Sequence, residues 1–216
     1  MSKIQVKAST LLAPLPAVMV SLGSMQNSNI ITVAWTGVIC SDPPRMYVSV
    51  RHERHSYQML LDKREFVINL TSEKLLAACD WCGIRSGRDF DKFAEMNLVK
   101  TPAPNLDDCP MIEQSPLCIE CKVFDVLNLG SHDMFLADVV AVHADESIMD
   151  EQGKIDYQKA NLVCYQHGDY YRIGKKLGRF GFAAQKKFIA KHGKGFGVDV
   201  SSAALAHRKP SKKSGK

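Results

Sequence analysis

Apolar and polar side chains alternate over short segments along much of this chain of 216 residues. An alternation with a period of two is typical of β-strands that bury one face. The pattern predicts strands over residues 17–22, 30–36, 45–51, 65–70, 117–127 and 133–144. The last two flank Asn128, Leu129, Gly130 and Ser131, whose composition is typical of a hairpin turn. The chain is therefore predicted to be mainly β.

Short helices are predicted between the strands. In residues 55–64, Ser56 is a candidate N-cap and the apolar positions share one side of a helix. Ser72 is a candidate N-cap of a second helix that ends near Cys82, and residues 89–96 predict one or two further helical turns.

Two segments show neither the alternation of a strand nor the apolar spacing of a helix. Residues 97–116 are rich in Pro and Asp and are predicted to be loop, and residues 167–182, rich in Gly and aromatic residues, predict a loop or cap. Many short strands without a βαβ alternation favour a barrel over a doubly wound sheet. No GxGxxG follows a strand and no GxxxxGK[ST] is present, so the Rossmann and P-loop classes are disfavoured.

Charge is distributed unevenly along the chain. The net charge is +5, but residues 183–216 hold nine Lys or Arg and one Asp, a balance of +8, which leaves −3 for the remainder. We expect residues 1–182 to form the folded domain and residues 183–216 to form a solvated, mobile tail. Non-specific attraction to nucleic acid is the alternative for the tail, and no specific nucleic-acid partner is expected.

The sequence predicts a cytoplasmic protein with no membrane association. No apolar run approaches the length of a membrane span, and residues 1–10 lack the apolar segment of a signal peptide. The seven cysteines are odd in number and scattered, which suits a reducing compartment better than a disulfide framework.

Four of the cysteines form two Cys-x-x-Cys pairs, Cys79 with Cys82 and Cys118 with Cys121. Such pairs can bind structural zinc, which is one hypothesis for this chain. The first pair shares a face of a predicted helix, whereas the second lies on a predicted strand, where positions i and i+3 point to opposite faces. That geometry disfavours a four-thiolate site and favours packing as small apolar residues, so no metal ligand is assigned.

Residues 29–51 are the most informative stretch. Hydroxyl and amide side chains stand among apolar ones on both sides of a break at Asp42, Pro43 and Pro44. This pattern favours a barrel wall that presents polar groups to a flat ligand. The following residues 51–57 place two arginines and a serine at a predicted helix start, where free N–H groups suit a phosphate; an ordinary basic loop remains the alternative.

The segments at 29–51 and 51–57, the strand EFVINL, the DKF motif, the hairpin ending FLADVVAV and the closing YYRIGKKLGRFGF together resemble the flavin reductase-like family. The resemblance covers about residues 10–182 and is greatest to the flavoredoxin branch of this family. It implies an FMN-binding split β-barrel with six strands in Greek-key order, a homodimer, and one FMN per subunit near the dimer interface.

The resemblance also implies a set of cofactor-binding residues. Thr32, Val33, Ala34, Trp35 and Thr36 would line the isoalloxazine ring, and Ser49, Val50 and Arg51 would run beside the ring and the ribityl chain. Arg54, Ser56 and Tyr57 would hold the phosphate with help from Lys92, and Asn29 and Asn69 would be polar neighbours. For Lys92 a solvated helix lysine is the alternative, and Asn69 could instead bond to a turn backbone.

The implied activity is that of an NAD(P)H-dependent flavin reductase, in which hydride passes from a nicotinamide to the flavin. Such a mechanism needs little from side chains, and the sequence contains no convincing acid–base pair or activated nucleophile, so no catalytic residue is assigned. The alternative is a flavoredoxin-like electron carrier that passes electrons between protein partners. An electron-accepting protein or a monooxygenase is the expected partner in either case.

Overall fold

The structure, a computed structural model of the chain, describes residues 2–184. The chain divides into two units, residues 1–174 and residues 175–216. Among the described residues, the first unit holds the β-structure and all helices except the short 3₁₀-helix η3 (Phe182–Ala184). The predicted basic tail falls almost wholly outside the described residues.

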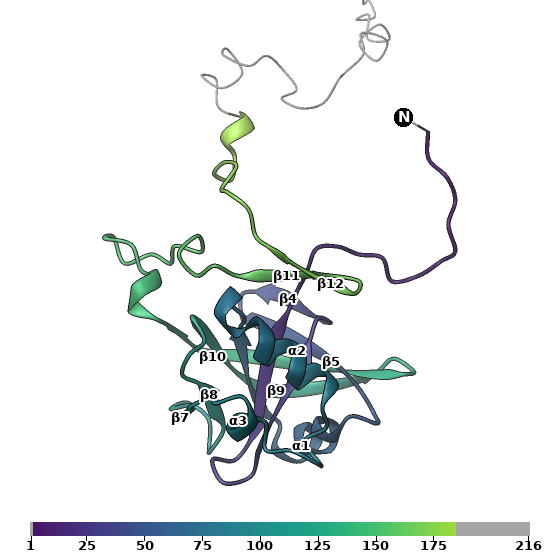
Figure 1. Cartoon of the computed structure of the whole chain (residues 1–216), viewed down its shortest axis with the longest axis vertical. Helices are drawn as coiled ribbons and strands as arrows, with labels where there is room; N and C mark the ends of the chain where they lie inside the picture. Colours follow the sequence, from purple (N-terminus) through teal and green to yellow (C-terminus); the bar gives the residue numbers. More distant parts are fainter. Residues whose placement is uncertain (1, 185–216) are drawn as a thin grey trace, which may run out of the picture. The chain divides into compact units, whose positions relative to one another are not determined.

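The first unit is built on one antiparallel sheet (Figure 1). Within the described residues this sheet has seven strands, one more than the resemblance implies. In spatial order they are β3 (Ser28–Val33), β2 (Val18–Gly23), β6 (Glu65–Leu70), β9 (Leu117–Asn128), β10 (His132–Ala144), β5 (Pro44–Arg51) and β4 (Thr36–Ser41). The long hairpin β9–β10 and the strand β6 agree with the predicted strands.

The two edges of this sheet are consecutive in the chain, which forces the sheet to curl. β3 ends at Val33 and β4 begins at Thr36, so only Ala34 and Trp35 connect the opposite edges. The backbone N–H of Ser49 on β5 donates to the carbonyl of Trp35 at 2.8 Å. The predicted single strand over residues 30–36 is therefore wrong, because the chain leaves one edge there and starts the other.

Curling encloses a hydrophobic core. Val20, Leu22, Phe66, Ile68 and Phe135 are fully buried within it. Complete burial of each side chain of this size contributes about 1.5–3 kcal/mol. One end of the core is closed by Leu60 of helix α1 (His55–Lys63).

A second cluster lies on the outer face of β2 and β3. There Met19 and Ile30 pack against Cys79 of helix α2 (Leu76–Ile84) and Phe93 of helix α3 (Lys92–Glu95). The 3₁₀-helix η1 (Glu73–Leu75) precedes α2, and a further one, η2 (Glu146–Ile148), follows β10. This packing places α2 beside the strand β3, whose last residues are at the closure of the barrel (Figure 1).

Two loop predictions are wrong in part. Residues 97–116 contain the short strands β7 (Lys100–Pro102) and β8 (Pro110–Ile112), which pair with each other. Residues 167–182 contain β12 (Asp169–Arg172), which pairs with β11 (Val163–Gln166), and β11 in turn pairs with β1 (Leu15–Pro16). The strands β7, β8 and β12 were missed because each has only three or four residues, too few to show a clear alternation of apolar and polar positions.

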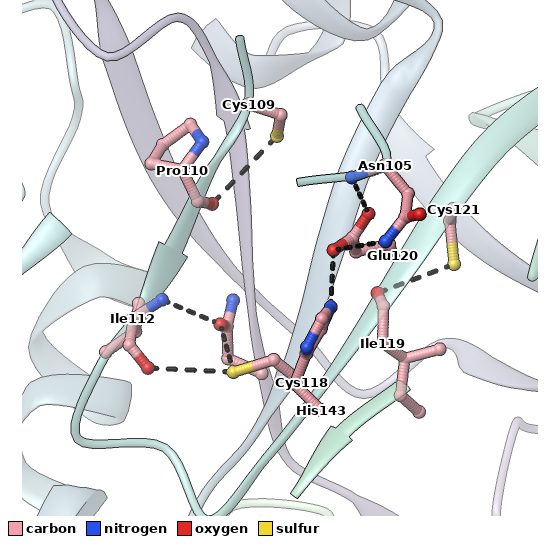
Figure 2. Close-up of polar contacts among 10 residues, drawn as sticks. Asn105, Cys109, Pro110, Ile112, Cys118, Ile119, Glu120, Cys121 and His143 are labelled. Carbon is pink, nitrogen blue, oxygen red and sulfur yellow. Dashed lines mark hydrogen bonds and ion pairs between the residues drawn. The ribbon is translucent and has the colours of Figure 1, made fainter. Parts of the chain in front are cut away.

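A buried carboxylate joins the barrel to the loop before β8 (Figure 2). Glu120 on β9 is fully buried. It accepts hydrogen bonds from Nε2 of His143 on β10 at 2.5 Å and from the backbone N–H of Asn105 at 2.9 Å. These bonds satisfy a charge that would otherwise be costly to bury.

Candidate functional site: two connected clefts

The first cleft lies at the closure of the barrel and has a volume of about 490 Å³. Backbone and side chains at the end of β3, the end of β5, the last turns of α2 and the β11–β12 hairpin form its walls. Its lining residues are Ala17, Ile31, Thr32, Val33, Ala34, Trp35, Ser49, Val50, Arg51, Arg54, Asp80, Gly83, Ile84, His132, Tyr165, Gly168 and Tyr170. The lining combines hydroxyls, aromatic rings and apolar groups, as is usual for a site that holds a ring system.

A second cleft of about 370 Å³ continues from the first. The two have Ile31, Arg54, Gly83 and Ile84 in common. The walls of the second cleft are the start of α1 and the chain that follows α2, residues 85–88. Together the clefts form one elongated site.

The second cleft is strongly cationic. Arg54, Arg85, Arg88 and Lys92 all line it. The ammonium of Lys92 is buried and donates to the carbonyls of Ile30 and Cys82, each at 2.7 Å, so the helical lysine is not solvated. Burial lowers the pKa of Lys92 from 10.5 to about 8.

The cationic surroundings also affect His55, which lines the same cleft. Burial lowers the pKa of His55, and the nearby charges of Arg88 and Lys92 lower it further. The cations around this imidazole suit an anion such as a phosphate.

Glycines allow the walls to approach closely. A Cβ atom on Gly83 would lie 3.2 Å from Cβ of Thr32, and a Cβ atom on Gly87 would lie 2.2 Å from Oδ1 of Asn29. The hydroxyl of Thr32 donates to the carbonyl of Cys79 and so fixes α2 to β3. Close approach at these points brings residues 83–88 to the site.

The structure brings most of the predicted binding residues together. Eight of them line the first cleft: Thr32, Val33, Ala34, Trp35, Ser49, Val50, Arg51 and Arg54. Asn29, Ser56 and Lys92 line the second cleft, where Arg54 also lies. Ser56 is not the N-cap, because Arg54 has that position; the Ser56 hydroxyl instead accepts a hydrogen bond from Asn29 Nδ2 at 2.8 Å.

Three predicted residues line neither cleft. The hydroxyl of Thr36 donates to the carbonyl of Tyr47 within the sheet. The Tyr57 hydroxyl donates to Asp133, the second residue of β10, at 2.6 Å. Asn69 is fully buried. Its Nδ2 donates to the carbonyl of Met19 and to Oγ of Ser21, and its Oδ1 accepts from the N–H of Ile112, so it bonds to neighbouring strands and not to a turn backbone.

Several cleft residues were missed in the sequence. The missed side chains with polar groups are Glu53, His55, Asp80, Arg85, Ser86, Arg88, His132, Tyr165 and Tyr170. The aromatic-rich segment that contains Tyr170 could have indicated a binding role from the sequence. The residues around Asp80 and His132 in the sequence form no motif that indicates one. Burial and the charge of Arg51 lower the pKa of His132, and burial together with the hydrogen bond to Asp80 raises the pKa of Tyr170.

The cysteine pairs do not share a site. Cys79 and Cys82 are buried against α3, whereas Cys118 and Cys121 belong to two other clusters on opposite faces of β9. Among the described residues 2–184, no group of three or more His, Cys, Asp or Glu side chains is placed to hold a metal ion. The separation of the pairs rules out the four-thiolate arrangement on which the zinc hypothesis depends.

No helix in the described part of the chain is long and apolar enough to span a membrane.

An antiparallel barrel with its cleft at the closing strands belongs to the split β-barrel class, and here the cleft is elongated and has one cationic end. Residues 12–174 match the family described as flavin reductase like domain. The chain therefore belongs to the flavin reductase-like family, in agreement with the resemblance seen in its sequence.

Three similar proteins illustrate the family. The structure of flavoredoxin from Desulfovibrio vulgaris (Miyazaki F) is 29% identical and has a TM-score of 0.80, covering 85% of this chain and all of that one. An NADPH-flavin oxidoreductase from Streptomyces viridifaciens is 27% identical over 50% of this chain and 56% of that protein. The stachydrine N-demethylase reductase subunit from Rhizobium meliloti is 30% identical over 46% of this chain and 40% of that protein.

Proposed function

We propose that this protein binds FMN and is an NAD(P)H-dependent flavin reductase, which transfers hydride from a nicotinamide to the flavin. One observation carries the proposal: two connected clefts form a single elongated site with a polar and aromatic end and a cationic end. A flavin mononucleotide has a flat ring at one end and one phosphate at the other. Family membership and the similarity to an NADPH-flavin oxidoreductase support the same activity.

The residues present fit this cofactor. The end of β3 and Ser49 of β5 offer backbone and hydroxyl groups along the first cleft, where a ring with carbonyl and imide groups would bind. Arg54, Ser56 and Lys92 in the second cleft would hold the phosphate by charge-assisted hydrogen bonds. FMN, when bound, supplies the hydride-accepting ring of the reaction.

The chain contributes position and shielding. Tyr165 and Tyr170 of the β11–β12 hairpin are in contact with each other, with ring centroids 5.4 Å apart, and both line the first cleft. Tyr170 is held by its hydrogen bond to Asp80 of α2 at 3.1 Å. The hairpin and α2 thus form one wall of the first cleft, which limits the access of water to a bound ring.

The visible spectrum of the purified protein tests flavin binding directly. We expect flavin absorption bands and release of FMN on denaturation, or stoichiometric uptake of FMN by protein purified without it. We also expect steady-state oxidation of NADH or NADPH in the presence of FMN. Protein that neither contains nor takes up FMN would contradict the proposal.

A second candidate function is that of an electron carrier between proteins. The similarity to flavoredoxin over 85% of the chain favours it. Both functions need the same clefts, so flavin binding does not discriminate between them. Tight binding of FMN without turnover of either nicotinamide nucleotide would exclude the reductase and favour the carrier.

We also propose that the chain is a homodimer that delivers electrons to a separate protein, such as a monooxygenase component. Val38 and Ile39 of the edge strand β4 and Val142 of β10 are exposed, and a second subunit would cover such apolar residues. The relative named a reductase subunit supports a separate acceptor. Light scattering that gives a mass of 24.0 kDa, the mass of one chain, would contradict the dimer.

A further inference from the structure

Asp133 is a buried carboxylate that lines neither cleft. It is the second residue of β10, next to His132, and only 7% of its surface is exposed. It accepts hydrogen bonds from the Tyr57 hydroxyl at 2.6 Å, from Asn128 Nδ2 at 2.8 Å and from His52 Nε2 at 2.8 Å. The bonds from His52 and Tyr57 lower the pKa of Asp133, and the Asp133 carboxylate raises the pKa of Tyr57.

One of these donors belongs to the turn that carries Arg51 and Arg54, and another to the start of the helix that follows this turn. His52 lies between Arg51 and Arg54, and Tyr57 lies in the first turn of α1. The backbone closes this turn with a bond from Arg54 N–H to the Arg51 carbonyl at 3.1 Å. Asp133 therefore fixes the turn on both sides of Arg54.

Contacts between aromatic rings also hold the turn and the start of α1 in place. The rings of His52 and Tyr57 meet edge to face at a centroid distance of 5.0 Å, and Tyr57 meets the fully buried Phe135 in the same way at 5.8 Å. From the opposite side, Asn29 of β3 bonds to Ser56. The start of α1 is thus held between β3 and β10.

The side chains of Arg51 and Arg54 do not have comparable anchors of their own. Arg51 pairs with Glu53 at 2.9 Å, but both side chains are more than half exposed, so this pair contributes little. Arg54 makes one long contact to the Gly83 carbonyl at 3.4 Å. The backbone of the turn therefore decides where these two cations point.

We propose that Asp133 is a positioning residue for the flavin site: through His52 and Tyr57 it sets the turn that presents Arg51 to the first cleft and Arg54 to the second cleft, where the phosphate-bearing end of the cofactor would bind. The inference rests on the proposed FMN binding. It predicts that loss of the Asp133 network weakens binding of FMN and leaves binding of riboflavin, which has the same ring and no phosphate, nearly unchanged.

The test measures dissociation constants for FMN and riboflavin by quenching of flavin fluorescence. In Asp133→Asn and Tyr57→Phe we expect the Kd for FMN to rise about tenfold, the effect of losing one charge-assisted hydrogen bond from Arg54 to the phosphate when the turn shifts, with little change for riboflavin. Tyr57→Phe removes only the hydroxyl and keeps the ring contacts, so it serves if Asp133→Asn does not fold.

Asp138→Asn is the matched control. It is the same substitution on the same strand, and Asp138 pairs with Arg45 at 2.7 Å away from both clefts. We expect it to leave both dissociation constants unchanged. The positioning role would be overturned if folded Tyr57→Phe kept the wild-type ratio of the two dissociation constants. This holds whether neither constant changes or both rise by the same factor. A wild-type protein that binds neither flavin would instead refute the proposed function.

Discussion

The buried ammonium of Lys92 leads us to predict that the affinity for FMN depends on pH. If it contributes to the binding of a phosphate, FMN affinity depends on its protonation. Burial favours the neutral amine and lowers the pKa of Lys92 from 10.5 to about 8. The charged form is present below that pH and is lost as the pH rises through it. FMN binding is therefore expected to weaken above pH 8.

The size of the expected fall in FMN affinity follows from the titration of Lys92. Between pH 7 and pH 9 the charged fraction of a group with a pKa of about 8 falls about tenfold, so the affinity for FMN is expected to fall about tenfold. The ceiling is the value of one charge-assisted contact, about 1.5–3 kcal/mol. Riboflavin has no phosphate, so the ratio of the two affinities isolates this effect from ionisation of the ring.

The assay is the titration of each flavin across pH 7 to pH 9.5 with wild type and Lys92→Met. In Lys92→Met we expect weaker FMN binding at pH 7 and no pH dependence in the ratio. Stability should change in the opposite direction: between pH 8 and 10.5 the unfolded chain keeps the Lys92 proton that the folded chain has lost, so this residue's contribution to the free energy of unfolding rises with pH. A wild-type affinity ratio that is constant over this range would refute the reasoning.

Four further substitutions test the packing of the fold and site. Gly87→Ala puts a carbon 2.2 Å from Oδ1 of Asn29 and should raise the Kd for FMN about tenfold in fluorescence titrations; a change of less than about twofold would contradict the close approach. Gly23→Ala forces alanine to a φ of +95° and should lower the free energy of unfolding in urea by about 1–3 kcal/mol. Glu120→Ala should lower it by about 2 kcal/mol, and the loss should not add to that of His143→Ala, since the two share one hydrogen bond; additive losses would count against the pair.

Much of the fold was predictable because its determinants are local. The hairpin β9–β10 has a long alternation and a turn of suitable composition, and β6 was predicted with its observed bounds. The break at Ala34 and Trp35 was not predictable in this way. Their residue types continue the strand pattern, and only the pairing of Thr36 with β5 shows that the chain has changed edge.

The residues of the site also differ in whether local sequence could predict them. Arg54 and Ser56 follow a strand and begin a helix, a local pattern that indicates an anion site. Tyr57 lies in the same motif, yet its hydroxyl turns to Asp133, a residue more than seventy positions later. Arg88 reaches the second cleft because Gly87 lets its loop approach Asn29, and no local pattern encodes that contact.

The sequence by itself determined that the chain is mainly β and resembles the flavin reductase-like family, and it predicted that residues 29–57 contribute to a ligand site. These properties follow from alternation, turn composition and motif order, all of which are expressed over short stretches of chain. The tertiary structure alone decided that α2 and the β11–β12 hairpin complete the clefts, and that Lys92 is buried at the cationic end. Those features depend on contacts between distant residues, whose side chains take their roles from the neighbours that folding gives them.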